Sequence, residues 1–224
     1  MKGKLIVLES GVDGAGKETQ AKLLEKSLIN AGVKTRRISF PAYESPSSAL
    51  VRMYLNGSFG LDPEAINPYA ASTFYSVDRL GSYLSDWKKD LEDGVVIILD
   101  RYTSSNMIYQ GAKLSGEERR TYLSWLDHHE HEICGLPRPD LMLFLDVEPE
   151  VSKKLREGRT LKVGGERDIH EENDSYMRTT CLAGREAAST FDWKVIACDN
   201  GSTMYDIDVI HQKIYQEALT LLHT

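Results

Sequence analysis

A glycine-rich segment near the N-terminus has the residue types and the spacing of a phosphate-binding loop. The segment G-V-D-G-A-G-K spans residues 11–17. Glycines let the backbone curl so that several N–H groups point at one anion, and a following helix N-terminus adds its positive dipole end. We expect Lys17 to face solvent and to place a mobile charge at the β- and γ-phosphates of a nucleotide. The predicted ATP-binding residues are Gly11, Val12, Gly14, Ala15, Gly16, Lys17, Glu18 and Thr19.

Residue 18 departs from the usual pattern of such a loop. A Ser or Thr normally follows the lysine and its hydroxyl binds Mg²⁺, whereas this chain has Glu18, with Thr19 one position later. A carboxylate is longer, charged and a good ligand for this hard cation. The hypothesis is that Glu18 enters the ligand shell of the metal and partly replaces the hydroxyl. The alternative is that Glu18 is only a favourable first-turn helix residue, stabilised by the dipole.

A second acidic residue follows the aliphatic run 95–99. Asp100 ends this predicted strand and Arg101 comes directly after it. Proteins with a phosphate loop place the acid that orients Mg²⁺ at the carboxyl end of a central strand. Glu18 and Asp100 are therefore the predicted metal residues, and Mg²⁺ is the predicted cofactor.

A long helical pattern over residues 64–92 carries an aromatic residue beside a guanidinium. Its apolar residues gather on one side of a helical wheel, which we expect to face the core: Thr73, Val77, Leu80, Leu84, Trp87 and Leu91. Tyr75 and Arg79 are one turn apart and lie away from that stripe. Such a pair can stack a base and donate a hydrogen bond to its carbonyl. The alternative is a surface tyrosine packed under an arginine.

The elements that must position these residues alternate along the chain. Apolar strand candidates at 5–8, 34–40, 95–99, 141–147 and 194–197 alternate with helical patterns, the later ones at 117–133 and 204–222. Strands that are apolar throughout belong to a parallel sheet covered on both faces. The prediction is an α/β fold with a doubly wound parallel sheet of the P-loop NTPase type, flanked by helices. Ligands of such sheets bind outside the carboxyl ends of the strands.

Composition excludes several classes of function. The chain has 224 residues with 27 basic and 34 acidic ones, a net charge of −7, which argues against a nucleic-acid binder but not against a small phosphorylated ligand. Cys134, Cys181 and Cys198 lack metal-type pairing and are typical of reduced thiols in a cytosolic protein. The aliphatic runs are too short for a membrane span, and the N-terminus does not have the pattern of a signal peptide. We expect no nucleic-acid or membrane partner and a cytoplasmic location.

Taken together, these residues resemble the thymidylate kinase family of P-loop nucleoside-monophosphate kinases. The resemblance covers nearly the whole chain. It rests on G-V-D-G-A-G-K at 11–17, F-P at 40–41, Y-S-V-D-R at 75–79, D-R-Y at 100–102, Y-Q-G at 109–111, G-L-P-R-P-D-L at 135–141 and E-R-D-I-H-E at 166–171. The aspartate within the loop, the D-R-Y and the Y-Q-G are together specific to this family.

The resemblance implies a role for each residue of the acceptor site. Tyr75 matches the ring that stacks on thymine, Arg79 the residue that binds its 4-carbonyl, and Gln110 the residue that reads the thymine edge. Tyr109 lies near the sugar, where it excludes ribose. The implied dTMP-binding residues are Phe40, Pro41, Tyr75, Arg79, Arg101, Tyr109 and Gln110.

The resemblance also implies catalytic residues and a lid. Asp13 reaches toward the acceptor nucleotide and Arg101 clamps the phosphates. Residues 156–171 correspond to a lid that closes over ATP within a single domain spanning 1–224. The family takes a catalytic arginine from the loop or from the lid, and position 14 is glycine, so the lid must supply it from Arg156, Arg159 or Arg167. The implied catalytic residues are Asp13, Lys17, Arg101, Arg159 and Arg167.

A second departure lies after Phe40-Pro41, where relatives carry an arginine for the acceptor phosphate. This chain has Ala42, Tyr43 and Glu44, and its next arginine is Arg52. Both departures leave the phosphate sites less positive.

The implied activity is transfer of the γ-phosphoryl group of ATP to dTMP, giving dTDP and ADP. Relatives are usually homodimers, and the regions 64–92 and 116–134 are the candidate contact surfaces. Two alternatives stay open at this stage. One is a kinase for another small nucleotide, and the other is a nucleotide-binding relative that lost turnover when Glu18 arose.

Overall fold

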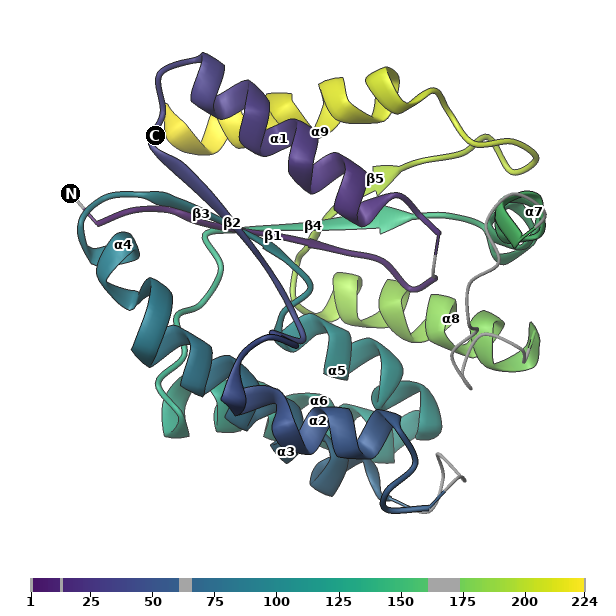
Figure 1. Cartoon of the computed structure of the whole chain (residues 1–224). Helices are drawn as coiled ribbons and strands as arrows, with labels where there is room; N and C mark the ends of the chain where they lie inside the picture. The colour runs from purple at the N-terminus through teal and green to yellow at the C-terminus, as the bar shows by residue number, and fades with distance from the viewer. Residues whose placement is uncertain (1, 13, 61–65, 161–173, 224) are drawn as a thin grey trace.

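A parallel sheet between two layers of helices forms the centre of the molecule (Figure 1). The computed structural model describes residues 2–12, 14–60, 66–160 and 174–223. The sheet has five strands in the order β2-β3-β1-β4-β5, all parallel. The strands are β1 (Leu5–Glu9), β2 (Thr35–Ser39), β3 (Val96–Asp100), β4 (Leu141–Asp146) and β5 (Lys194–Ala197). The predicted α/β fold with a doubly wound parallel sheet is therefore confirmed.

Helices cover both faces of this sheet. The α-helices are α1 (Lys17–Asn30), α2 (Ala49–Leu55), α3 (Pro68–Ser82), α4 (Lys88–Glu92), α5 (Thr103–Tyr109), α6 (Gly116–His128), α7 (Pro149–Thr160), α8 (Asp174–Thr190) and α9 (Ile207–Leu222). Short 3₁₀ turns are η1 (Pro46–Ser48) and η4 (Gly111–Lys113), and π-helical turns are η3 (Tyr83–Trp87) and η5 (His129–Ile133). Figure 1 shows α1 and α9 on one face and α3, α5, α6 and α8 on the other. Over the part of the chain that the structure describes, no helix is long and apolar enough to cross a membrane.

Alternate residues of β1 enter the two hydrophobic cores on either side of the sheet. Ile6 and Leu8 belong to the core under α1 and α9, whereas Leu5 and Val7 belong to the core that contains Trp87. All four are at most 1% exposed. Burial of both faces explains why residues 5–8 of β1 are all apolar instead of alternating with polar residues.

The ends of the three neighbouring strands β2, β3 and β1 meet at one edge of the sheet. In the register of the sheet, Asp100 pairs with Leu8 of β1 and with Ser39 of β2. The phosphate loop after β1, the Phe40 segment after β2 and Arg101 after β3 therefore begin at the same edge. This edge is where ligands bind in open α/β sheets.

The predicted core stripe of the helix over 64–92 was wrong at Thr73, Val77 and Leu84. Val77 and Leu84 are 47% and 59% exposed, while Trp87 is fully buried. The π-helical turn η3 joins α3 to α4, and its extra residue shifts the angular phase of the helix. As a result, the buried face of α3 is polar and consists of Ser72, Ser76, Asp78, Arg79 and Ser82, together with Pro68 and Ala71.

Four helices were absent from the prediction, namely α2, α5, α7 and α8. The buried residues of α8 include Cys181, Ala183, Ala187 and Ala188. Small side chains give little contrast in hydrophobicity between the two faces of a helix, so the periodic signal is weak.

Candidate active site

The glycine-rich loop joins β1 to α1 as predicted. Gly14 and Gly16 have φ angles of 79° and 86°, in the left-handed region that glycine adopts at little cost. Gly16 is the N-cap of α1, so the loop leads directly into a helix N-terminus. A Cβ atom at Gly11 would lie 2.8 Å from the Cα of Cys181, which shows that α8 packs directly on the start of the loop.

Lys17 lies inside this loop, and the expectation of a solvent-facing side chain was wrong. It is the first residue of α1 and only 7% exposed. Its Nζ atom lies 3.5 Å from the carbonyl oxygen of Val12, at the far side of the loop. The loop backbone curls around the ammonium group, which places a positive charge within the predicted phosphate cradle.

Glu18 occupies the first turn of α1 and directs its carboxylate away from the loop. The carboxylate accepts a hydrogen bond from Nζ of Lys22, one turn further along the helix. This bond lowers the pKa of Glu18. The side chain of Glu18 is 67% exposed, and Thr19 is exposed as well. Neither side chain therefore lies inside the loop beside Lys17.

Asp100 and Arg101 lie at the carboxyl end of β3. Asp100 is 8% exposed, and burial raises the pKa of its carboxyl group, although the positive charges of Lys17 and Arg101 act in the opposite direction. Arg101 has a φ angle of 70°, which is rare for a residue with a side chain. Such backbone strain clusters at functional sites because the surrounding structure must hold it in place.

The Arg101 side chain has an aromatic and an acidic neighbour. Its guanidinium carbon lies 5.2 Å from the centre of the Tyr109 ring, and its Nη1 lies 3.8 Å from Oε1 of Glu9. Glu9 is completely buried and accepts hydrogen bonds from the Ser10 backbone N–H and from the hydroxyls of Ser104 and Ser105. The sequence analysis did not single out Glu9, which directly follows the predicted strand 5–8.

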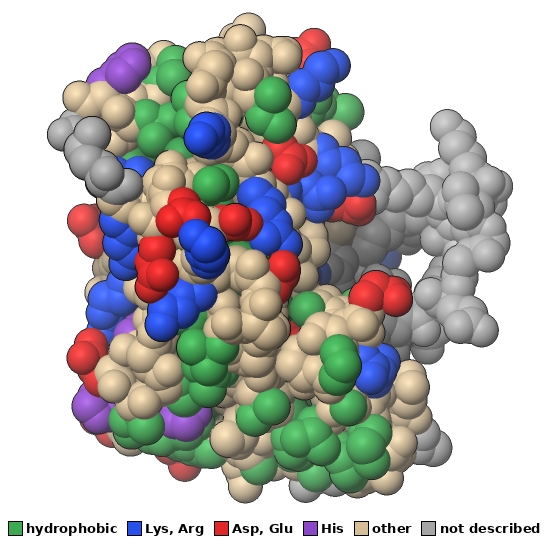
Figure 2. Space-filling view, turned by 60° about the vertical axis from the view of Figure 1, so that its left-hand side comes forward, with side chains coloured by type: hydrophobic (Ala, Val, Ile, Leu, Met, Phe, Trp, Pro, Cys, Tyr) green, Lys and Arg blue, Asp and Glu red, His purple; other side chains and the backbone are tan. Residues whose placement is uncertain are grey.

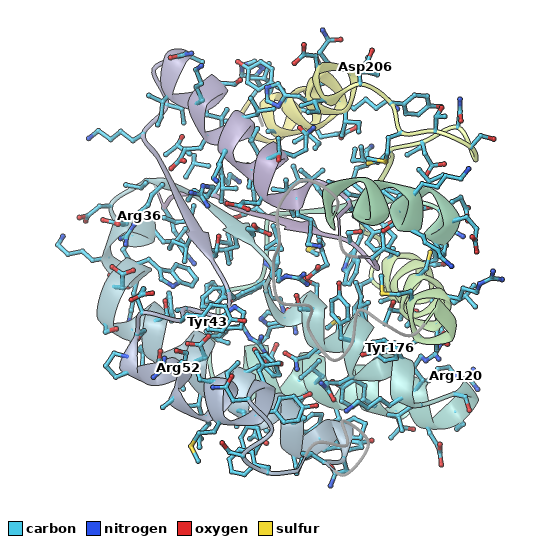
Figure 3. All side chains as sticks on the ribbon, turned by 45° about the vertical axis from the view of Figure 1, so that its right-hand side comes forward. Arg36, Tyr43, Arg52, Arg120, Tyr176 and Asp206 are labelled. Carbon is cyan, nitrogen blue, oxygen red and sulfur yellow. The ribbon has the colours of Figure 1, made fainter. Side chains whose placement is uncertain are left out.

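A cavity of about 150 Å³ lies beside the Arg101 guanidinium. Every residue predicted to bind the acceptor lines it. The lining residues are Phe40, Pro41, Tyr43, Leu55, Tyr75, Arg79, Arg101, Tyr102, Ser105, Asn106, Tyr109, Gln110 and Tyr176. Figure 3 shows Tyr43 and Tyr176 on opposite sides of this region, one after β2 and the other on α8.

Arg79 reaches the cavity from the buried face of α3. It is only 2% exposed, so the expectation that it lies on the flank away from the core was wrong. The guanidinium donates to Glu130 and, from Nη2, to Oδ1 of Asn106 at 2.8 Å. The π-helical turn η3 is the reason that α3 turns this side inward.

Gln110 contributes an acceptor that lacks a partner. It is 4% exposed, and its Oε1 atom has no hydrogen-bond partner among the residues that the structure describes. A buried amide oxygen without a partner is unfavourable, so its place in the cavity wall points to a donor on a bound ligand.

The segment after Phe40-Pro41 is held in place by two charged side chains. The Asp78 carboxylate accepts hydrogen bonds from the Ala42 N–H at 2.9 Å and from the Ser47 hydroxyl at 3.0 Å. Arg52 donates to the carbonyl of Tyr43 at 2.6 Å, and the two lie side by side in Figure 3. Arg52 thus orients this segment and is not among the residues that line the cavity.

Several residues of this site were not predicted from the sequence, and several predicted ones lie outside the described part of the chain. Asn106 lies on α5, one turn before the C-cap residue Gln110, and this spacing would have indicated it. Nothing in the sequence pointed to Tyr176. Asp13 and Arg167 lie outside the described residues. Arg156 and Arg159 belong to α7, but their side chains are also outside the described part.

Comparisons with known proteins relate nearly the whole chain to one family of enzymes. The family model described as thymidylate kinase matches residues 10–214. Thymidylate kinase from Mycobacterium tuberculosis is 33% identical over 186 residues, covering 82% of each chain. The human thymidylate kinase is 28% identical over 95% of this chain and 88% of its own. A solved structure of thymidylate kinase from Candida albicans superposes with a TM-score of 0.71 at 25% identity, covering 98% of this chain and 92% of that one.

Proposed function

Because this chain belongs to the thymidylate kinase family, we propose that its cavity binds dTMP and that its glycine-rich loop binds the ATP phosphates. The protein is a phosphotransferase that phosphorylates dTMP, and the family uses ATP. The assignment of the cavity to dTMP rests on one observation: its wall holds a hydrogen-bond donor together with an acceptor. Arg79 supplies N–H groups, and Oε1 of Gln110 is an acceptor without a partner among the described residues.

The base edge of thymine is complementary to this pair. Thymine presents its 4-carbonyl oxygen as an acceptor beside its N3–H donor. A guanidinium N–H of Arg79 donates to the carbonyl, and Oε1 of Gln110 accepts from N3–H. Tyr75 lines the same cavity and supplies a ring face for stacking, while Tyr109 lies toward the sugar.

Charge neutralisation at the loop and at Arg101 supports the transfer step. An oxygen of the acceptor phosphate forms a bond to the γ-phosphorus as the bond to the bridging β–γ oxygen breaks, which leaves ADP and dTDP. No covalent enzyme intermediate is needed, so the protein contributes positioning and electrostatic stabilisation. Lys17 lies within the loop, and Arg101 is held between Tyr109 and Glu9 at the cavity wall. The strained backbone of Arg101 is maintained because it keeps the guanidinium at this position.

The residues at the end of β3 fit a magnesium ion that arrives with ATP. Mg²⁺ in such sites keeps several waters and takes one or two carboxylates in addition to substrate phosphates. Asp100 is a buried carboxylate among positive neighbours and would hold the ion or its waters. Glu18 would have to leave Lys22 to join it. When bound, the ion supplies further neutralisation of phosphate charge.

A lid over residues 156–171 completes the single domain in this proposal. One of its arginines, Arg156, Arg159 or Arg167, supplies the second catalytic guanidinium, because position 14 of the loop is glycine. Support comes from the family resemblance and from the place of α7, which follows β4 at the carboxyl edge of the sheet in Figure 1.

The exposed apolar residues of α2, α3 and η3 support a homodimer. Leu50, Met53, Val77 and Leu84 are between 37% and 59% exposed. Figure 2 shows hydrophobic side chains gathered low on the molecule, where Figure 1 places α2 and α3. A patch of this kind marks an interaction surface. Substituting Val77→Asp should give a monomer of 25.2 kDa in sedimentation, whereas a wild-type protein of that mass would contradict the proposal.

A coupled assay of ADP release tests the function. With ATP and Mg²⁺, we expect the highest kcat/KM with dTMP when the deoxynucleoside and ribonucleoside monophosphates are compared side by side. A higher value with another monophosphate would contradict the assignment of the cavity. Nucleotide binding without ADP release would contradict turnover itself.

A further inference from the structure

We propose that Glu130 is a positioning residue that orients Arg79 and thereby sets the choice of pyrimidine. The inference rests on the proposed contact between Arg79 and the 4-carbonyl of thymine. Glu130 lies on the π-helical turn η5, far from α3 in sequence, and does not line the cavity.

The contact between the two side chains is a two-point fork. Nε of Arg79 donates to Oε2 of Glu130 at 2.9 Å, and Nη2 donates to Oε1. Oε1 also accepts a hydrogen bond from the Ser76 hydroxyl at 2.6 Å. Glu130 is completely buried, so both oxygens depend on these donors. A bidentate pair of this kind fixes direction as well as distance.

The fork determines which N–H group of Arg79 remains for a ligand. A guanidinium has five N–H groups in one plane. Glu130 accepts hydrogen bonds from the Nε–H group and from one N–H of Nη2. Asn106 Oδ1 accepts from the other N–H of Nη2, and the carbonyl of Tyr102 accepts from one N–H of Nη1 at 3.3 Å. One Nη1 N–H is left without a bond among the described residues. Because the group is planar and rigid, fixing its Nε–Nη2 edge fixes the direction of this last donor.

The remaining donor distinguishes bases by the group at C4. Thymine and uracil carry a carbonyl oxygen there, which accepts the hydrogen bond. Cytosine carries an amino group, which is itself a donor and faces the Nη1 N–H unfavourably. A guanidinium free to rotate would lose part of this discrimination, since it could turn a different edge toward the base.

Stability alone gives a weak reason for a buried ion pair in this position. Desolvation of both charges offsets most of their attraction, so apolar residues of similar size stabilise a core about as well. The pair lies directly behind the cavity, and one of its members forms part of the cavity wall. This placement favours an orienting role.

The test compares Glu130→Gln with a matched control on the same turn. Glu132 is 58% exposed and pairs with Arg138 at the surface, so Glu132→Gln should behave as the wild type. For Glu130→Gln we expect the KM for dTMP to rise about tenfold, with an unchanged KM for ATP. The ratio of kcat/KM for dTMP over dCMP should fall by a similar factor. A purely structural role would not change this ratio.

Two further variants keep the outcome decisive. Glu130→Asp retains the charge but moves it back by one methylene. This variant should fold and should still lower the ratio of kcat/KM for dTMP over dCMP. In an Arg79→Gln background, adding Glu130→Gln should change the KM for dTMP by less than about twofold, because Glu130 acts through Arg79.

The outcomes separate this inference from the proposed function. If Arg79→Gln leaves the KM for dTMP unchanged, the proposed contact of Arg79 with thymine is wrong. Suppose instead that Arg79→Gln raises the KM for dTMP, while Glu130→Gln and Glu130→Asp fold and match Glu132→Gln in the KM for dTMP and in the ratio of kcat/KM for dTMP over dCMP. Glu130 is then not a positioning residue.

Discussion

The carboxylate of Glu18 and the ammonium of Lys22 form an ion pair across one turn of α1, on the solvent side of the phosphate loop. Both side chains are more than half exposed. An exposed pair with this spacing contributes only about 0.3–0.5 kcal/mol. Glu18 can therefore exchange Lys22 for a metal ion at little cost.

The first prediction concerns the metal dependence of turnover. If Glu18 joins the ligand shell when ATP brings Mg²⁺, Glu18→Gln should raise the Mg²⁺ concentration for half-maximal rate by about two- to fivefold. Glu18→Ser restores the usual hydroxyl and should keep or increase turnover. Titration of the ADP-release rate with Mg²⁺ at fixed ATP measures both effects.

Lys22→Ala serves as the opposite perturbation. It releases Glu18 and should lower the required Mg²⁺ concentration by a factor of about two. If all three variants keep the wild-type Mg²⁺ dependence and rate, Glu18 is a first-turn helix residue and other groups hold the metal.

A second prediction follows from the position of Lys17 inside the loop. Lys17→Ala should lower kcat by roughly 10²- to 10³-fold, because the segment 11–17 loses its only basic side chain. The folded state should persist, since the lost hydrogen bond to Val12 is long, at 3.5 Å. Circular dichroism provides the control. A variant that keeps most of its activity would mean that this loop does not bind the reacting phosphates.

The strand ends of this protein could be predicted from sequence, but the orientation of α3 could not. Apolar runs reveal strands buried on both faces, and the topology of a parallel sheet then brings residues 11–17, Phe40 and Arg101 to one edge. The phase of α3 depends on η3, and the wheel drawn at a constant angle per residue placed Val77 inside and Arg79 outside. A π-helical turn has no reliable sequence signature, so hydrophobic periodicity alone could not predict which side of α3 faces the core.

Glu130 shows a second limit of sequence reasoning. Glu130 lies in a run of charged and histidine residues, 127–132, that is typical of a solvated surface. Its burial depends on Arg79, which is 51 positions away. Partners that are distant in sequence and charged can be recognised only after the fold has placed them together.

A third prediction uses the raised pKa of Asp100. Burial makes the ionised carboxylate unfavourable in the folded protein, so the folded state binds the proton more tightly than the unfolded state. Stability therefore falls as the pH rises from the unfolded pKa, near 3.8, through the raised folded value. Asp100→Asn removes this cost, so it should raise the thermal midpoint at pH 7 and lose that advantage in acid.

The same variant should be less active. Loss of the carboxylate that we propose to hold Mg²⁺ or its waters is expected to reduce turnover roughly 10- to 100-fold. Thermal unfolding at several pH values, combined with the ADP-release assay, measures both changes. A variant that is less stable at pH 7 would show that attraction to Lys17 and Arg101 outweighs burial.

The last prediction concerns the unpartnered amide oxygen of Gln110. In the protein without ligand, a buried acceptor that lacks a donor costs about 1–3 kcal/mol. Gln110→Leu keeps a side chain of similar size and removes the acceptor, so it should raise the thermal midpoint of the free protein. In the proposed complex the same oxygen accepts from N3–H of thymine, and its loss should raise the KM for dTMP by roughly 5- to 150-fold. The KM for ATP should stay unchanged, because the proposed site of the ATP phosphates is the loop and not this cavity. Saturating dTMP should therefore stabilise the wild type in thermal unfolding far more than it stabilises the variant. Equal stabilisation of both proteins by dTMP would show that Gln110 does not contact the base.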